Sequence, residues 1–201
     1  MKSESEQIIT GRNGNLKNAL IEAGVRLLCD EGVEKLSLRR VAASCGVSHG
    51  APYNHFIDKH DFLLTIQSYI LNELKKSLLV VLENHQGEKA AVQLRLLCRS
   101  YVSFMVEHPH YLRALHMNRI GPNIDMDTMF YHLFADPDYG LLLNALSLYT
   151  QERHLENPET IRTYLMVWSL IHGYATLLAE NMLRNDGDYL AVLDCMLEKL
   201  I

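Results

Sequence analysis

Apolar residues recur at intervals of three and four along almost the whole of this 201-residue chain. This spacing places them on one face of an α-helix. The first such stretch includes Leu16, Leu20 and Leu27. Asn15 can cap its start, and Gly32 follows its end. Because no segment shows the alternation typical of a strand, the sequence predicts an all-α fold.

The remaining helices can be placed from the same pattern. Ser37 and Ser48 can each cap a short helix, and a turn containing Gly46 joins these two helices. A long amphipathic helix is expected from Lys59 to about Glu83. Further helices are expected at Glu88–Glu107, Tyr111–Met117, Asp125–Phe134, Tyr139–Leu155, Glu159–Leu183 and Tyr189–Leu200. No internal repeat is present, so the helices should pack as a bundle.

Composition excludes several classes of protein. With 48% hydrophobic and 21% charged residues, the chain has the balance of a globular domain. Its longest uncharged stretch, Thr163 to Ala179, has 17 residues, fewer than the ~20 of a membrane-spanning helix. The N-terminal residues contain no apolar signal segment. We therefore expect a cytoplasmic protein without a membrane partner.

Neither the cysteines nor the histidines form a metal-binding pattern. No CxxC pair occurs among the cysteines, which stand at positions 29, 45, 98 and 195. This scatter favours reduced thiols over a disulfide framework or a zinc site. His108, His110 and His116 straddle Pro109 and share no helical face. We expect no metal and no cofactor.

Charge divides unevenly along the chain. The formal net charge is −5, whereas Thr10 to Lys59 carries seven Lys or Arg against five acidic residues, a local charge of +2. The rest of the chain is therefore at −7. A basic segment joined to an acidic body is expected where only that segment meets phosphate.

The two short helices have the arrangement of a helix-turn-helix, in which the second helix lies in the major groove of DNA. Leu38, Val41 and Ala42 on the first short helix and Val47 in the turn can build a small core with the preceding helix. Ala42 and Gly46 are small where the two helices are expected to approach closely.

The segment from Leu36 to Leu63, above all VSHGAPYNHFIDKHDFLL, closely resembles the DNA-binding head of the TetR family of bacterial regulators. The sequence from Trp168 to Gly173, WSLIHG, resembles a subgroup with a C-terminal Trp…His-Gly signature. The resemblance implies a three-helix helix-turn-helix head joined by a long helix to a C-terminal ligand-binding and dimerisation bundle. The expected divisions are a flexible arm at 1–13, the DNA-binding domain at 14–60 and the remaining domain at 61–201.

The resemblance also implies which side chains meet DNA. Ser37 and Ser48, at helix N-termini, can present hydroxyl and N–H groups to phosphates. In the family, the residues matching Tyr53, His55 and Lys59 contact the DNA backbone. The expected base contacts are His49, Gly50 and Asn54, and the further basic candidates are Arg39 and Arg40.

Two residues of the second short helix call for a comment: one constrains where the helix begins, and the other departs from the family pattern. Pro52 has no N–H, so the second short helix can begin nearer Gly50 than Ser48. Asn54 stands where relatives often carry Arg, which removes one electrostatic contact. Phe56 is expected in the core.

The body is expected to bind a small hydrophobic or amphipathic molecule and to form a homodimer. Ligand-lining candidates are the aromatic and methionine residues Tyr101, Phe104, Met105, Tyr111, Met117, Phe130, Tyr149, Met166 and Tyr174. An apolar seam predicts a dimer interface formed by Leu165, Trp168, His172, Leu190, Leu193, Leu197 and Leu200. Gly173 would let a partner backbone approach.

The sequence therefore predicts a ligand-responsive transcriptional regulator that binds double-stranded operator DNA, associates with the nucleoid when bound, and carries no catalytic residues. Repression of a palindromic operator is the family's usual mode. Two alternatives stay open. One is an architectural or division-linked DNA-binding protein without a sensor. The other is an all-α enzyme that uses His172 with Glu180 or Asp186, although no catalytic motif supports it.

Overall fold

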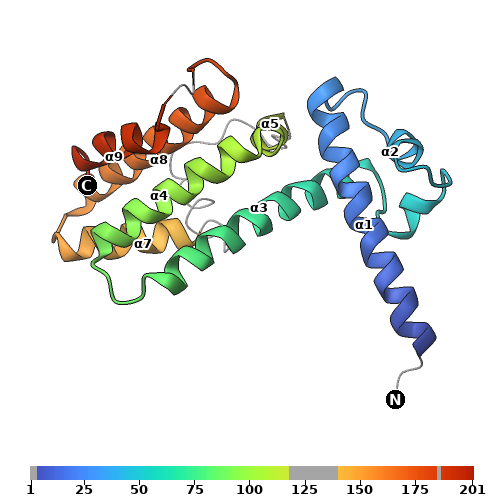
Figure 1. The fold of residues 1–201 in the computed structure, drawn as a ribbon, viewed down its shortest axis with the longest axis horizontal. Coiled ribbons are helices and arrows are strands. Elements are labelled where there is room, and N and C mark those ends of the chain that lie inside the picture. Colours follow the sequence, from blue (N-terminus) through green and yellow to red (C-terminus); the bar gives the residue numbers. More distant parts are fainter. Residues whose placement is uncertain (1–3, 118–139, 185–186) are drawn as a thin grey trace. The chain divides into compact units, whose positions relative to one another are not determined.

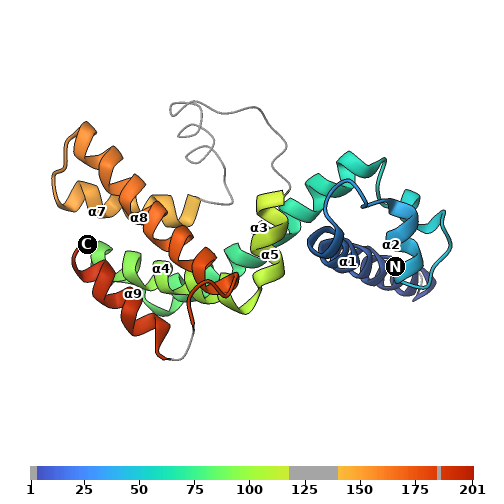
Figure 2. The same ribbon diagram turned by 90° about the horizontal axis from the view of Figure 1, so that it is seen from above.

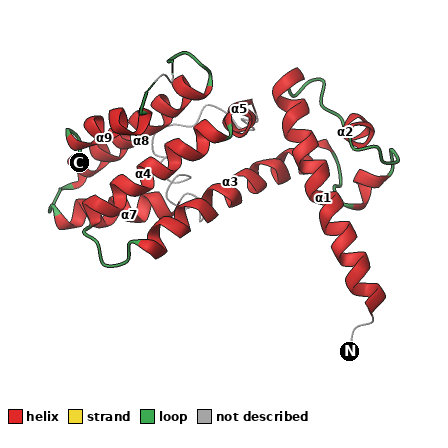
Figure 3. Ribbon diagram, viewed as in Figure 1, coloured by secondary structure: helices red, strands yellow, loops and turns green. Residues whose placement is uncertain are grey.

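The computed structural model describes residues 4–117, 140–184 and 187–201, and these residues form helices and loops without a strand (Figure 3). This confirms the predicted all-α fold class. The helix predicted at Asp125–Phe134 lies outside the described residues. Contacts divide the chain into two compact units, Met1–Ile70 with Arg113–Ile120, and Leu71–Leu112 with Gly121–Ile201. The boundary at Ile70 falls within a long helix, α3 (Lys59–Asn84).

The first unit contains α1 (Glu4–Glu31), α2 (Leu38–Ser44), a 3₁₀-helix η1 (Ala51–Asn54) and the first part of α3 (Figure 1). Its core joins these elements through fully or nearly fully buried side chains: Leu20, Leu28, Val41, Phe56 and Phe62. The rings of Phe56 and Phe62 meet edge to face, with their centroids 4.7 Å apart. Phe56 is thus a core residue, as predicted.

The ends of α1 test two predictions. The helix begins at Glu4, so the start predicted at Asn15 is wrong. The helical period of Leu16 and Leu20 marks only the part with an apolar face, and the chain before it is helical without that signal. At the other end Gly32 adopts φ +81°, and its N–H donates to the Leu28 carbonyl, as expected of a C-terminal glycine. The flexibility of segment 1–13 stays a prediction.

Two glycines of the first unit have different physical roles. Gly46, between α2 and η1, has φ +66°, and a Cβ placed there would meet no atom within 4 Å. Its role is conformational, so the close approach predicted for it is wrong. Gly24 on α1 is the site of close approach, because a Cβ there would lie 2.3 Å from Cζ of Phe62.

The second unit is organised around α4 (Ala90–Glu107). This helix packs against α7 (Gly140–Glu152), α8 (Asn157–Ala179) and α9 (Tyr189–Glu198) (Figures 1 and 2). Helix α5 (Pro109–Met117) follows α4 in the chain and is divided between the two units after Leu112. The core side chains are Leu94, Leu97, Cys98, Tyr101 and Met105 of α4 with Leu146, Val167, Ile171, Leu193 and Leu197 of the surrounding helices. Every helix predicted within the described part of this unit is present, with ends shifted by four residues or fewer.

Within the described residues, no helix is long and apolar enough to cross a membrane. The same residues contain no cluster of ligating side chains that could hold a metal ion. The cysteines are free and differ in environment. Cys98 is buried, and this burial raises the pKa of its thiol to about 12, whereas Cys195 is exposed.

Candidate DNA-reading head and ligand groove

The second element of the helix-turn-helix is shorter and tighter than the sequence predicts. It is the 3₁₀-helix η1, capped by Gly50, with Pro52 in its first turn. The N–H groups of Tyr53 and His55 donate to the carbonyls of Gly50 and Pro52, three residues earlier. Ser48 is therefore not the cap. Pro52 is buried and needs no donor at this position, which explains why the helix begins near Gly50.

The residues around η1 form one exposed run. Ser48, His49, Gly50, Tyr53 and Asn54 are all exposed, and 56% of the surface of Tyr53 is accessible. Because Pro52 and Phe56 are buried, they anchor the element to the core and leave its polar side chains outside. This run contains every base-contact candidate predicted from the sequence.

The first helix of the pair is capped by Ser37. Its backbone is extended, and its Oγ accepts a hydrogen bond of 3.4 Å from the N–H of Arg40. Arg39, on the same helix, is exposed and makes no hydrogen bond or ion pair with any described residue. Its guanidinium is therefore available to an external anion.

Two other predicted DNA contacts are engaged within the protein. Arg40 binds both carboxylate oxygens of Glu31 at 2.5 Å and also donates to the Lys35 carbonyl. The hydrogen-bonded pair lowers the pKa of Glu31 and raises that of Arg40. Lys59 donates from Nζ to the Val33 carbonyl at 2.5 Å. Both cations thus hold the chain at and just after the C-terminal end of α1.

A reciprocal pair of aspartates fixes the link between η1 and α3. Asp58 accepts a hydrogen bond from the N–H of Asp61, and Asp61 accepts one from the N–H of Ile57, each at 2.9 Å. This arrangement resembles a capping box. It sets the path of the chain between His55, which is half-buried, and the first turn of α3.

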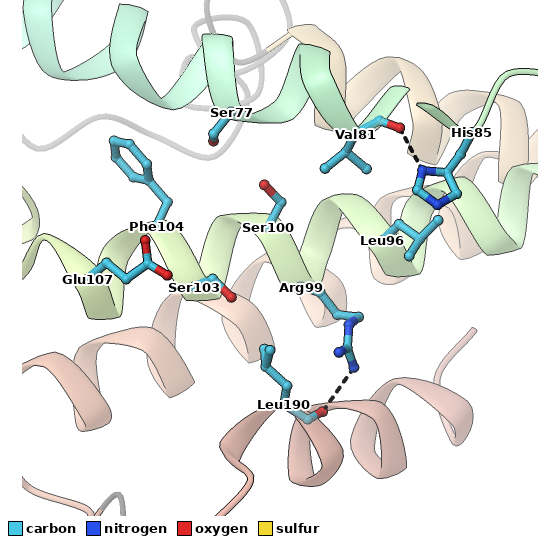
Figure 4. A pocket seen from close by; sticks show the side chains of 10 residues that line it. All are labelled: Ser77, Val81, His85, Leu96, Arg99, Ser100, Ser103, Phe104, Glu107 and Leu190. Carbon is cyan, nitrogen blue, oxygen red and sulfur yellow. Dashed lines mark hydrogen bonds between the residues drawn. The ribbon is translucent and has the colours of Figure 1, made fainter. Parts of the chain in front are cut away.

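A groove lies on the second unit where α3, α4 and the start of α9 meet, with a volume of about 390 Å³ (Figure 4). Helix α4 forms its floor, α3 forms one wall, and Leu190 of α9 lies on the other side. The lining residues are Ser77, Val81, His85, Leu96, Arg99, Ser100, Ser103, Phe104, Glu107 and Leu190. The volume is within the ~300–1,000 Å³ range of small-molecule sites.

Only Phe104 of the predicted ligand residues lines this groove. Tyr101, Met105, Tyr111 and Tyr149 are core residues, with 6% or less of their surface accessible. Met166 is exposed, and Tyr174 donates to the Tyr189 carbonyl. The side chain of Met117 and all of Phe130 lie outside the described residues.

Two of the predicted dimer-seam residues are core residues of the protomer, and the other five are partly accessible. Leu193 and Leu197 have no accessible surface, and Leu190 lines the groove. The ring of Trp168 stacks on His172, whose Nδ1 lies 2.6 Å from the Tyr101 hydroxyl on α4. Leu165 and Leu200 are partly accessible. His172 is thus part of the packing between α4 and α8, and its proposed catalytic partner Asp186 lies outside the described residues.

A different set of side chains points outward from the last two helices. On α8, Met166 and Leu177 expose 47% and 39% of their surface, and Gly173 is exposed between them. On α9, Val192 exposes 52% and Cys195 is also exposed. The dimer interface stays a prediction, because α8 is apolar on several sides and periodicity does not tell which stripe meets a partner.

A helix pair joined by a glycine turn, with an apolar face of the first helix in the core and an exposed second element, is a helix-turn-helix. A family model described as bacterial regulatory proteins of the tetR family matches residues 20–66. A second, described as a tetracyclin repressor-like C-terminal domain, matches residues 94–200. The chain belongs to the TetR family.

Relatives and solved structures agree with this assignment. An uncharacterised HTH-type transcriptional regulator of Bacillus subtilis, YerO, is 22% identical over 82% of this chain and 56% of its own. A second, YwcC, is 38% identical over 31% of this chain and 27% of its own. The chain thus spans about half or less of these relatives.

Solved structures share the fold. A TetR family regulator from Marinobacter aquaeolei aligns with a TM-score of 0.75 at 17% identity, over 95% of this chain and 97% of its own. The regulator FadR from Bacillus subtilis, solved in complex with stearoyl-CoA, aligns with a TM-score of 0.71 at 17% identity, over 91% and 96% of the two chains.

Proposed function

We propose that this protein is a homodimeric transcriptional regulator that binds a palindromic operator and releases it when a small molecule binds the second unit. The observation that carries this proposal is the exposed run from Ser48 to Asn54, held on a buried scaffold in a head that matches the family. A rigid element that presents polar side chains outside the fold can enter a major groove without rearrangement.

The polar side chains of the run divide into two chemical roles. Asn54 offers a donor and an acceptor that can pair with an adenine edge, and His49 can reach an adjacent base. Ser48 and the hydroxyl of Tyr53 can donate to phosphates, and Arg39 adds a free guanidinium. In this proposal Arg40 and Lys59 mainly stabilise the head, because each already donates a hydrogen bond to an acceptor within the protein.

Helix α3 supports the proposed response to a ligand. It is continuous from Lys59, in the head, to His85 just past its end, at the groove. A molecule that binds the groove more tightly in one position of α3 shifts the protein toward that position. Moving the population from 1:99 to 99:1 requires a preference of ~5.5 kcal/mol, which a dimer can share between two grooves.

The effector class is proposed from the groove, not from the relatives. FadR was solved with stearoyl-CoA, an amphipathic molecule, but its 17% identity to this chain shows only the fold. The groove of this chain combines apolar walls with serine hydroxyls and charged residues. These features favour an amphipathic effector of medium size.

Operator binding can be tested by selecting fragments of the source chromosome that bind the purified protein and measuring their affinity by fluorescence anisotropy. Changing Asn54→Ala should lower affinity for the selected operator by about 1–3 kcal/mol and relax preference at one base position in each half-site. Asn18→Ala, an exposed asparagine on α1 outside the run, is the matched control and should bind as the unchanged protein does. Failure to select any preferred fragment at low salt would overturn the proposal.

A further inference from the structure

The charges that line the groove do not cancel. Arg99 is paired with Asp194 of α9 and also donates to the Leu190 carbonyl (Figure 4). Its charge is therefore compensated within the protein. Glu107, at the other end of the lining segment of α4, makes no hydrogen bond or ion pair with any described residue. Among the described residues that line the groove, Glu107 is thus a carboxylate without a compensating cation.

Arg99 and Glu107 cannot neutralise each other directly. They lie eight residues apart on α4, which corresponds to ~12 Å along a helix axis. Ser103 lies between them on the same face. Each charge therefore meets a different part of any molecule that occupies the groove.

Two neutral polar side chains of the groove, His85 and Ser77, have their donor groups engaged within the protein. The Nδ1 of His85 lies 2.9 Å from the Val81 carbonyl, which can only accept, so Nδ1 carries the proton. In the neutral ring, Nε2 then presents a lone pair. The hydroxyl of Ser77 donates to the Leu74 carbonyl and is left with its lone pairs. An occupant that supplies hydrogen-bond donors can use these two acceptors in addition to the Glu107 carboxylate.

The surroundings of Glu107 suit an organic cation. Phe104 precedes it by three residues, so the two side chains lie on neighbouring positions of the same helix face. Both line the groove, and 8% of the surface of Phe104 is accessible. An aromatic ring beside a carboxylate attracts an ammonium group through its π-face and through charge. Beyond them, Val81, Leu96 and Leu190 provide apolar contact.

We propose that the groove binds an amphipathic monocation, with its ammonium group at Glu107 and Phe104 and its apolar part along Val81, Leu96 and Leu190. This inference rests on the proposed function, in which a ligand in this groove controls the head. Beyond the proposed function, this inference specifies that the ligand is positively charged and that its charge is recognised at the Glu107 end of the groove.

Three matched probes test the charge. They are 4-phenylbutyltrimethylammonium, its neutral isostere with a tert-butyl group in place of trimethylammonium, and the anion 5-phenylpentanoate. Calorimetry with the full-length protein should give a dissociation constant about tenfold lower for the cation than for the neutral probe, since a partly exposed ion pair and a cation–π contact each contribute modestly. The preference should shrink as salt is raised.

Three variants locate the site. Glu107→Gln should bring the cation and the neutral probe to equal affinity, and Glu107→Lys should make the anion the tightest of the three. Glu83→Gln, an exposed change on α3 outside the groove lining, is the matched control and should keep the tenfold preference. Glu107 is exposed and has no partner among the residues that the structure describes, so its variants should melt at the same temperature as the unchanged protein.

The possible outcomes separate this inference from the proposed function. Equal binding of cation and neutral probe, tighter binding of the anion to the unchanged protein, or a cation preference that survives Glu107→Gln would each overturn the inference about the groove. A cation preference that depends on Glu107 supports it. If that cation binds but leaves operator affinity unchanged, the groove inference stands and the proposed coupling to the head fails.

Discussion

Replacing Gly173 with alanine tests where two protomers meet. Gly173 lies in the interior of α8 and is exposed, and a Cβ added there would meet no atom within 4 Å in the protomer. In a protomer alone, Gly173→Ala should therefore raise the free energy of unfolding by about 0.5–1 kcal/mol, because alanine is the better helix former.

The same change should weaken a dimer that packs on this face. Met166 lies two turns before Gly173 and Leu177 lies one turn after it, and both are exposed, so a partner helix lying on this row would pass closest at the glycine. An added methyl group at such a contact costs about 1–3 kcal/mol through overpacking. In a symmetric dimer the contact occurs in both protomers. We expect the dimer to dissociate at least tenfold more readily, a loss of about 1.4 kcal/mol.

Sedimentation across a range of protein concentrations measures the dimer constant, and denaturation at one low concentration measures protomer stability. Gly140→Ala on α7 is the matched control, because its new methyl group would meet only the Asn144 amide, at 3.9 Å. A protein with alanine at 173 that dimerises as tightly as the unchanged protein would refute the placement of the interface at this row.

Two further changes have outcomes set by the described contacts. Gly24→Ala should lower the free energy of unfolding by about 1–2 kcal/mol in chemical denaturation, because the new Cβ would lie 2.3 Å from the buried ring of Phe62 and this cost exceeds the helix-propensity gain. A more stable variant would show that Phe62 can move aside. At pH 8, iodoacetamide should modify exposed Cys195 quickly and leave Cys98 unmodified until the protein unfolds, because burial raises the pKa of the Cys98 thiol to about 12. Rapid modification of Cys98, detected by peptide mass spectrometry, would mean that α4 opens easily.

The sequence was informative wherever one helix face was apolar and the other polar. The long helix predicted from Lys59 to about Glu83 ends at Asn84, and the glycine expected after α1 is Gly32 in a left-handed conformation. The sequence was misleading where one residue type can serve either of two structural roles, as glycine does. Gly46 was expected at a close approach, yet its role is its positive φ, and the close approach occurs at Gly24.

The groove between α3, α4 and α9 was not predicted, for a related reason. Its α4 residues, such as Arg99, Ser103 and Glu107, form a polar stripe at helical spacing, which is also the pattern of a solvent-facing surface. The sequence does not reveal that α3 and α9 flank this polar stripe of α4. That arrangement depends on how helices that are distant in the sequence pack together. Of the aromatic residues predicted to line a ligand site, Phe104 lines this groove, whereas residues such as Tyr101 lie in the core.

Two basic residues of the head are hydrogen-bonded within the protein, and this helps to explain why the proposed regulator would act as a dimer. Between Ser37 and Lys59 the basic side chains are Arg39, Arg40 and Lys59, and the last two are already bound to groups at the end of α1. Affinity for DNA grows with the number of phosphates that cations neutralise, so one head in which two of these three cations are engaged should bind more weakly than one in which all three are available. A second head fixed at the right spacing binds at a high effective concentration and restores affinity without new contacts. Under this argument, a change in the spacing of the two heads is enough to release the operator, and a ligand that shifts α3 needs no direct effect on η1.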